Sequence, residues 1–132
     1  MRAAAGAVAL GVLLTGCTSG GPRFDVDDLA AGACAEAGPA LLSVETTQQA
    51  VADGELEPAD AAADYEQVQN DLLAARESAD PEVADPLRAL VTSLGLCRSG
   101  AGVGTTSDVQ REQLRGDLDD VLVACGVTPD GG

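Results

Sequence analysis

The chain has 132 residues, which is enough for one small domain. Its formal net charge of −15 would repel nucleic acid and anionic lipid headgroups, so we expect neither as a ligand. All seven basic residues are arginine. Without histidine or lysine there is no Ser-His or Cys-His pair, imidazole metal ligand or Schiff-base amine. We therefore expect a protein that is not an enzyme and that has no cofactor.

The first element is a run of small apolar residues over 3–14, preceded by Arg2 and followed by Cys17. A membrane-spanning helix needs about 20 apolar residues, so this run is too short to span a bilayer. A positive residue, a short apolar stretch and small residues before a cleavage point are typical of a secretory signal peptide. We expect residues 1–16 to be such a signal.

The tetrapeptide Leu14-Thr15-Gly16-Cys17 resembles the lipobox of bacterial lipoproteins, and all four positions match. The resemblance implies cleavage by signal peptidase II between Gly16 and Cys17. It also implies a diacylglycerol on the Cys17 sulfur and allows an acyl chain on the new amino group. Such a protein is held on the extracytoplasmic face of the cell membrane, since two or more acyl chains anchor stably. The arginine-only, alanine-rich composition is typical of GC-rich genomes such as those of actinobacteria.

Behind the lipobox we expect a tether over 17–23, an acidic helical domain over 24–127 and a disordered tail over 128–132. The segment TSGGPR reaches only about 20 Å when extended, so the domain should lie close to the membrane. A short helix is predicted over 28–37, ending at Gly38. Pro39 favours the first turn of a second helix that ends near Gly54, with Gln48 at the edge of its apolar stripe.

The helix over 57–79 has the clearest apolar seam, formed by Ala61, Tyr65, Val68, Leu72, Ala75 and Ala79. A further helix begins near Pro81, or near Asp85-Pro86 as favoured for its main body, and ends around Cys97 and Gly100. After a loop over 98–107, Ser107 and Gln110 predict the start of the last helix, which Gly126 caps. Short connections favour antiparallel neighbours. The expected fold is therefore all-α: a small, disulfide-stapled up-down bundle of three long helices with one or two short ones.

Three cysteines remain for pairing if Cys17 is acylated, and an exported domain meets an oxidising environment. In an up-down bundle Cys34 and Cys125 lie at the same end, whereas Cys97 lies at the other. A disulfide needs Cα atoms within about 7 Å, which favours Cys34–Cys125, with Cys34–Cys97 as the alternative. Closing so long a loop would stabilise the fold by about 4 kcal/mol. The third thiol is expected to be buried and inert.

Paired carboxylates are the remaining candidates for chemistry. Two acidic runs are weak candidates for a calcium site, and they consist of Asp25, Asp27 and Asp28, and of Asp117, Asp119 and Asp120. Neither run supplies the glycine of an EF-hand loop, so no metal is assigned.

We therefore expect a membrane-anchored, non-enzymatic lipoprotein that binds another envelope or secreted protein. The alternative is a lipoprotein that binds a small ligand or a calcium ion through its acidic clusters.

Overall fold

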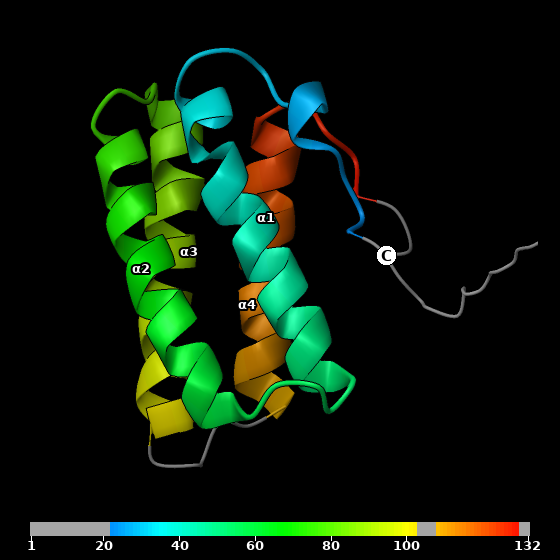
Figure 1. Ribbon diagram of the computed structural model, residues 1–132. Helices are drawn as coiled ribbons and strands as arrows, with labels where there is room; N and C mark the ends of the chain where they lie inside the picture. Colours follow the sequence, from blue (N-terminus) through cyan, green and yellow to red (C-terminus); the bar gives the residue numbers. More distant parts are fainter. Residues whose placement is uncertain (1–21, 103–107, 130–132) are drawn as a thin grey trace, which may run out of the picture.

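The computed structural model describes residues 22–102 and 108–129, and these ranges are helical throughout, apart from turns and connections (Figure 1). A 3-10 turn, η2 (Val26–Asp28), precedes four helices: α1 (Ala33–Ala52), α2 (Pro58–Arg76), α3 (Pro81–Gly102) and α4 (Asp108–Ala124). Successive helices run in opposite directions. The predicted all-α, up-down bundle is confirmed, with four long helices where three were expected.

Proline and glycine set several of the helix ends. Pro58 and Pro81 are the first residues of α2 and α3, where the missing N–H costs no intrahelical hydrogen bond. Gly54 and Gly126 follow α1 and α4 with φ of 76° and 88°, a left-handed conformation that glycine adopts without strain. These four ends agree with the predicted boundaries to within a few residues.

The predicted helix end at Gly38 is wrong, because α1 continues through Gly38 and Pro39. Gly38 is buried, and a Cβ at this position would lie 3.2 Å from Leu29 Cδ1 and 3.5 Å from Val26 Cβ. The glycine therefore allows η2 and the following turn to pack closely on α1. The separate short helix over 28–37 is replaced by η2 and the first turn of α1.

The loop predicted over 98–107 is also shorter than expected, since α3 extends to Gly102. Residues 103–107, with Ser107 of the predicted capping pattern, lie outside the described residues, as does the end of the tail over 130–132. The stretch 121–127 has some strand propensity in the sequence, but it forms the last turn of α4 and its cap.

The core is aliphatic and relies on leucine. Its fully buried leucines come from every helix and are Leu41, Leu72, Leu87, Leu90, Leu94, Leu114, Leu118 and Leu122. Tyr65 and Phe24 are the aromatic residues that border this cluster. At one end of the bundle Cys34 and Cys125 form a disulfide with Cα atoms 5.6 Å apart, as the topology predicted.

Candidate functional site

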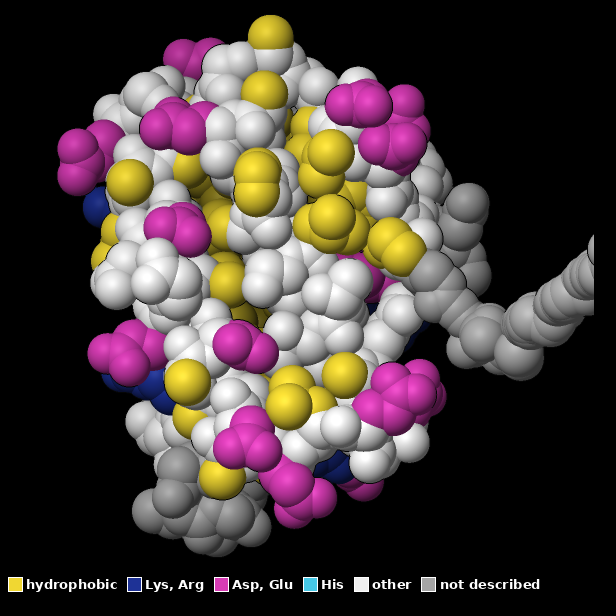
Figure 2. Space-filling view, viewed as in Figure 1, with side chains coloured by type: hydrophobic (Ala, Val, Ile, Leu, Met, Phe, Trp, Pro, Cys, Tyr) yellow, Lys and Arg dark blue, Asp and Glu magenta, His cyan; other side chains and the backbone are white. Residues whose placement is uncertain are grey.

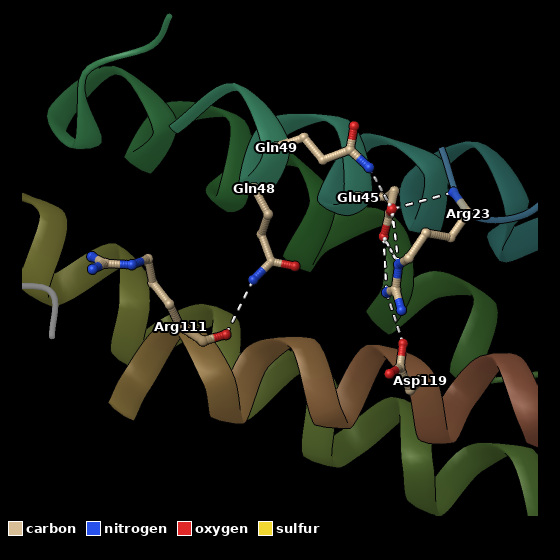
Figure 3. A network of polar contacts seen from close by, with 6 residues as sticks. All are labelled: Arg23, Glu45, Gln48, Gln49, Arg111 and Asp119. Atoms are coloured by element: carbon tan, nitrogen blue, oxygen red, sulfur yellow. Dashed lines mark hydrogen bonds and ion pairs between the residues drawn. The ribbon is translucent and has the colours of Figure 1, made fainter. Parts of the chain in front are cut away.

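The helices do not pack equally well around the bundle. Close backbone approaches are numerous between α1 and α2, between α2 and α3, and between α3 and α4, but few between α1 and α4. We call this last boundary the α1–α4 seam. It is fastened by the Cys34–Cys125 disulfide at one end and by polar side chains farther along it (Figure 3).

The central fastening is a buried ion pair that Arg23 makes with both helices. Its Nε and Nη2 atoms donate to the Glu45 carboxylate of α1 at 3.0–3.2 Å. Nη2 also donates to Oδ1 of Asp119 on α4 at 2.8 Å. The Arg23 backbone N–H donates to Glu45 Oε2 at 3.3 Å, so both backbone and side chain are held. We call this group the Arg23 clasp.

The clasp lies away from solvent. The side chains of Arg23 and Glu45 are 9% and 3% exposed, respectively, and that of Asp119 is 32% exposed. Burial by itself would lower the pKa of Arg23, but the hydrogen bonds and charges of Glu45 and Asp119 raise it overall. Arg23 therefore remains a cation in the clasp. Its Nη1 atom is buried and has no hydrogen-bond partner in the part of the chain that the structure describes.

Beyond the clasp the seam widens into a shallow cleft of about 300 Å³. The cleft is lined by long polar and charged side chains, whose aliphatic parts form much of its surface, and by Ala52; the polar residues are Glu45, Gln48, Gln49, Asp108, Arg111, Glu112 and Arg115. Gln48 Nε2 donates to the backbone carbonyl oxygen of Arg111 at 3.2 Å, which links α1 to α4 directly. Gln49 Nε2 donates to Glu45 Oε2 at 2.7 Å, and Arg111 forms an ion pair with Asp108.

The acidic candidates for a calcium site do not converge. Asp25 accepts a hydrogen bond from the Asp27 backbone N–H and thereby caps η2. Asp117 is buried on α4 and accepts hydrogen bonds from Ser93 and Gln113, whereas Asp119 belongs to the clasp. Within residues 22–102 and 108–129, no three histidine, cysteine or acidic residues are grouped so as to hold a metal ion.

Cys97 takes no part in the disulfide and is buried near the opposite end of the bundle, as expected. Its Sγ atom lies 3.5 Å from the carbonyl oxygen of Gln110 in the first turn of α4. Burial raises the pKa of the Cys97 thiol, and the nearby charge of Arg111 only partly opposes this. A thiol with a raised pKa is a weak nucleophile near neutral pH, in keeping with the predicted inertness.

Cys17, the predicted lipidation site, and Gly16 lie outside the described residues. Among the helices that are described, none combines the length and the apolar character needed to cross a bilayer. Arg23, predicted as the last residue of the tether, belongs instead to the folded domain through its clasp. Its partners are 22 and 96 residues away, so no local pattern marks it.

Two other hollows lie on the surface. One, of about 600 Å³, is open to solvent beside η2 and is lined by Pro22, Arg23, Phe24, Asp25, Val26, Asp28, Leu42, Val127 and Thr128. The other is a groove of about 160 Å³ between α1 and α2, where Asp64 and Asp71 face Pro39, Ala40 and Ser43. Neither brings together the groups of a recognisable catalytic site.

Comparisons with known proteins gave no match to a family model, to a curated protein or to a solved structure. The function must therefore be inferred from the residues of this chain.

Proposed function

We propose that the protein is a lipoprotein anchored through Cys17 to the extracytoplasmic face of the cell membrane, where its helical domain binds another envelope or secreted protein. The observation that carries the first part is the LTGC lipobox at 14–17 behind an apolar run. The Arg23 clasp supports it from the structural side. It makes the domain begin six residues after Cys17, as suits a module held against a membrane.

The charge of the domain supports the second part and indicates the kind of partner. Carboxylates are spread over the face formed by α1 and α2, with few arginines among them (Figure 2). Asp64 and Asp71 are both exposed on this face and flank the groove against α1. Complementary charge steers association and selects partners, so the partner is expected to present a basic surface.

Anchoring is tested on the protein purified from its native membranes. The N-terminal peptide should begin at Cys17 and carry the mass of a diacylglycerol, and Cys17→Ala should leave the membrane fraction. An unmodified Cys17 in the membrane-bound protein would overturn this part of the proposal.

Partner binding is tested by carbodiimide coupling in intact membranes, which joins carboxylates to amines. This chemistry suits a chain that has 22 acidic residues and no lysine, because it couples this protein's carboxylates to a partner's lysines. We expect one coupled species that Cys17→Ala loses and that weakens as salt is raised before coupling. Products that are the same for an unrelated acidic lipoprotein would contradict the proposal.

A further inference from the structure

The point at which the chain leaves the bundle is fixed by the Arg23 clasp. The segment that leads into η2, blue in Figure 1, runs beside α1 and α4 on the side away from α2 and α3, and Arg23 contacts Glu45 of α1 and Asp119 of α4. Glu45 and Asp119, which hold Arg23, both lie within their helices and not at their termini. The chain therefore exits from the long side of the bundle, at the α1–α4 seam.

The length of chain before this exit limits how the domain can be placed. Arg23 is the sixth residue after Cys17, and an extended chain over this interval spans at most about 20 Å. Two layers of helices, each about 10 Å thick, are as thick as this reach. If Cys17 is held in the bilayer by its lipid, the α2–α3 side can face the bilayer only when the tether passes around the bundle. The tether is too short for this path.

We propose that the α1–α4 side of the bundle faces the lipid headgroups and that the α2–α3 side faces outward, so that the helices lie along the membrane surface. This inference rests on the proposed lipidation of Cys17. It deepens the proposed function by stating which side of the domain the membrane covers.

The charged side chains that line the cleft on the α1–α4 side largely compensate one another. Glu45 is paired with Arg23, and Asp108 is paired with Arg111. Of the charged residues that line the cleft, this leaves Glu112 and Arg115, which balance each other. Asp25 and Asp28 are exposed beside Arg23 and would be repelled by anionic headgroups, so the acyl anchor has to supply the attraction to the membrane.

The lysine-free sequence provides a direct test. The variants Arg115→Lys and Arg98→Lys each introduce one lysine and preserve the charge. Arg115 lines the cleft on the α1–α4 side, whereas Arg98 lies 3.9 Å from Glu66 across α2 and α3. Each lipidated, full-length variant is labelled with an amine-reactive fluorophore and reconstituted in phosphatidylcholine vesicles that contain nitroxide-headgroup lipid. The lysine-free parent measures any labelling of the N-terminal amine.

We expect the fluorophore on R115K to be quenched about threefold more than that on R98K, because two layers of helices separate the sites. Equal quenching, or stronger quenching of R98K, would overturn the proposed placement. Inserting about ten glycine and serine residues after Gly20 should remove the contrast, since a tether of that length can reach around the bundle. A contrast that survives the insertion would show that the tether does not set the placement and would also overturn it.

The same experiment separates the two levels of inference. If the parent protein does not associate with vesicles and Cys17 carries no lipid, the proposed anchoring fails. If the lipidated protein associates but the two sites are quenched equally, only the placement fails.

Discussion

At the scale of single residues, Glu45 shows how the bundle tolerates a carboxylate in its interior. It is 2% exposed and lies one residue after Val44, which is fully buried. A buried carboxylate is costly unless it is paired and hydrogen-bonded. Glu45 receives donors from Arg23 and from Gln49, so both of its oxygens are used. Its role is to join the start of the domain to α1.

The variant Glu45→Gln tests this role. It keeps the shape of the side chain but removes the charge that pairs with Arg23, and we expect it to lower the free energy of unfolding by about 2 kcal/mol. Urea unfolding followed by circular dichroism measures the change. Glu112→Gln is the matched control, because Glu112 is exposed, and it should change stability by less than about 0.5 kcal/mol. Equal midpoints for the two variants would contradict a structural role for the clasp.

Tyr65 provides a second residue-scale prediction, on pH. Burial, and to a lesser extent the thiol of Cys97, raises the pKa of Tyr65 to about 12, although Arg111 opposes the shift. In the unfolded chain the phenol titrates near 10. Between these values the unfolded state binds fewer protons, so stability falls as the pH rises, by about 2–3 kcal/mol in total.

The chain has one tyrosine and no tryptophan, so phenolate absorbance reports Tyr65 alone. The folded protein should titrate near pH 12, and the protein in concentrated urea near pH 10. Tyr65→Phe should reduce the alkaline loss of stability, and the part that persists is expected from Cys97, whose pKa burial also raises. A folded-state midpoint that matches the unfolded one would show that Tyr65 is open to solvent.

At the scale of elements, α1 is continuous because Gly38 serves packing and not helix termination. An alanine in place of a helical glycine normally stabilises a helix by about 1 kcal/mol. At Gly38 the added Cβ would approach Leu29 Cδ1 to 3.2 Å, whereas at Gly116 in α4 nothing lies within 4 Å. The two positions should therefore respond differently to the same substitution.

We expect Gly116→Ala to raise the free energy of unfolding by about 0.5–1 kcal/mol, and Gly38→Ala to gain less or to lose stability. The difference arises because the Leu29 side chain, which is buried, has to shift to admit the new methyl group. Thermal unfolding of the two variants beside the parent measures it. If Gly38→Ala were as stabilising as Gly116→Ala, the close packing of η2 on α1 would not be what requires the glycine.

The elements also show which parts of the structure a sequence can predict. The apolar seam from Ala61 to Ala75 and the helix ends at Gly54 and Gly126 depend on residues close in sequence, and these predictions are confirmed. Ala79 lies beyond the end of α2 at Arg76, and α3 begins at Pro81, the earlier of the two predicted starts. The helix end predicted at Gly38 is wrong because glycine is favoured both after the end of a helix and where another segment packs closely on a helix. The Arg23 clasp escapes prediction because its partners are distant, and an arginine after a glycine-rich segment is typical of a tether.

At the scale of the whole molecule, the weak packing of α1 against α4 gives the disulfide its importance. Cys34 and Cys125 are 91 residues apart, so their bond closes almost the whole domain into a loop. It also lies beside the hydrogen bond from the Ala30 N–H to the Cys125 carbonyl oxygen, which ties the turn after η2 to the end of α4. The Arg23 clasp and the Gln48 hydrogen bond to the Arg111 carbonyl oxygen are further connections across the seam. The covalent bond therefore joins the two neighbouring helices whose backbones approach each other at the fewest positions.

Reduction should lower the free energy of unfolding by about 4 kcal/mol. Because a small domain has little stability to lose, the reduced protein is expected to be largely unfolded at 37 °C. Urea midpoints with and without a thiol reductant measure the effect, and Cys34→Ser with Cys125→Ser should reproduce the reduced state. Cys97→Ser should keep the full response to reductant, because Cys97 is not part of the bond.

In mild reductant, amide exchange should increase first in η2 and the first turns of α1, whose connection to α4 is then lost. Exchange that increases uniformly over all four helices would instead mean that the seam does not open before the bundle unfolds.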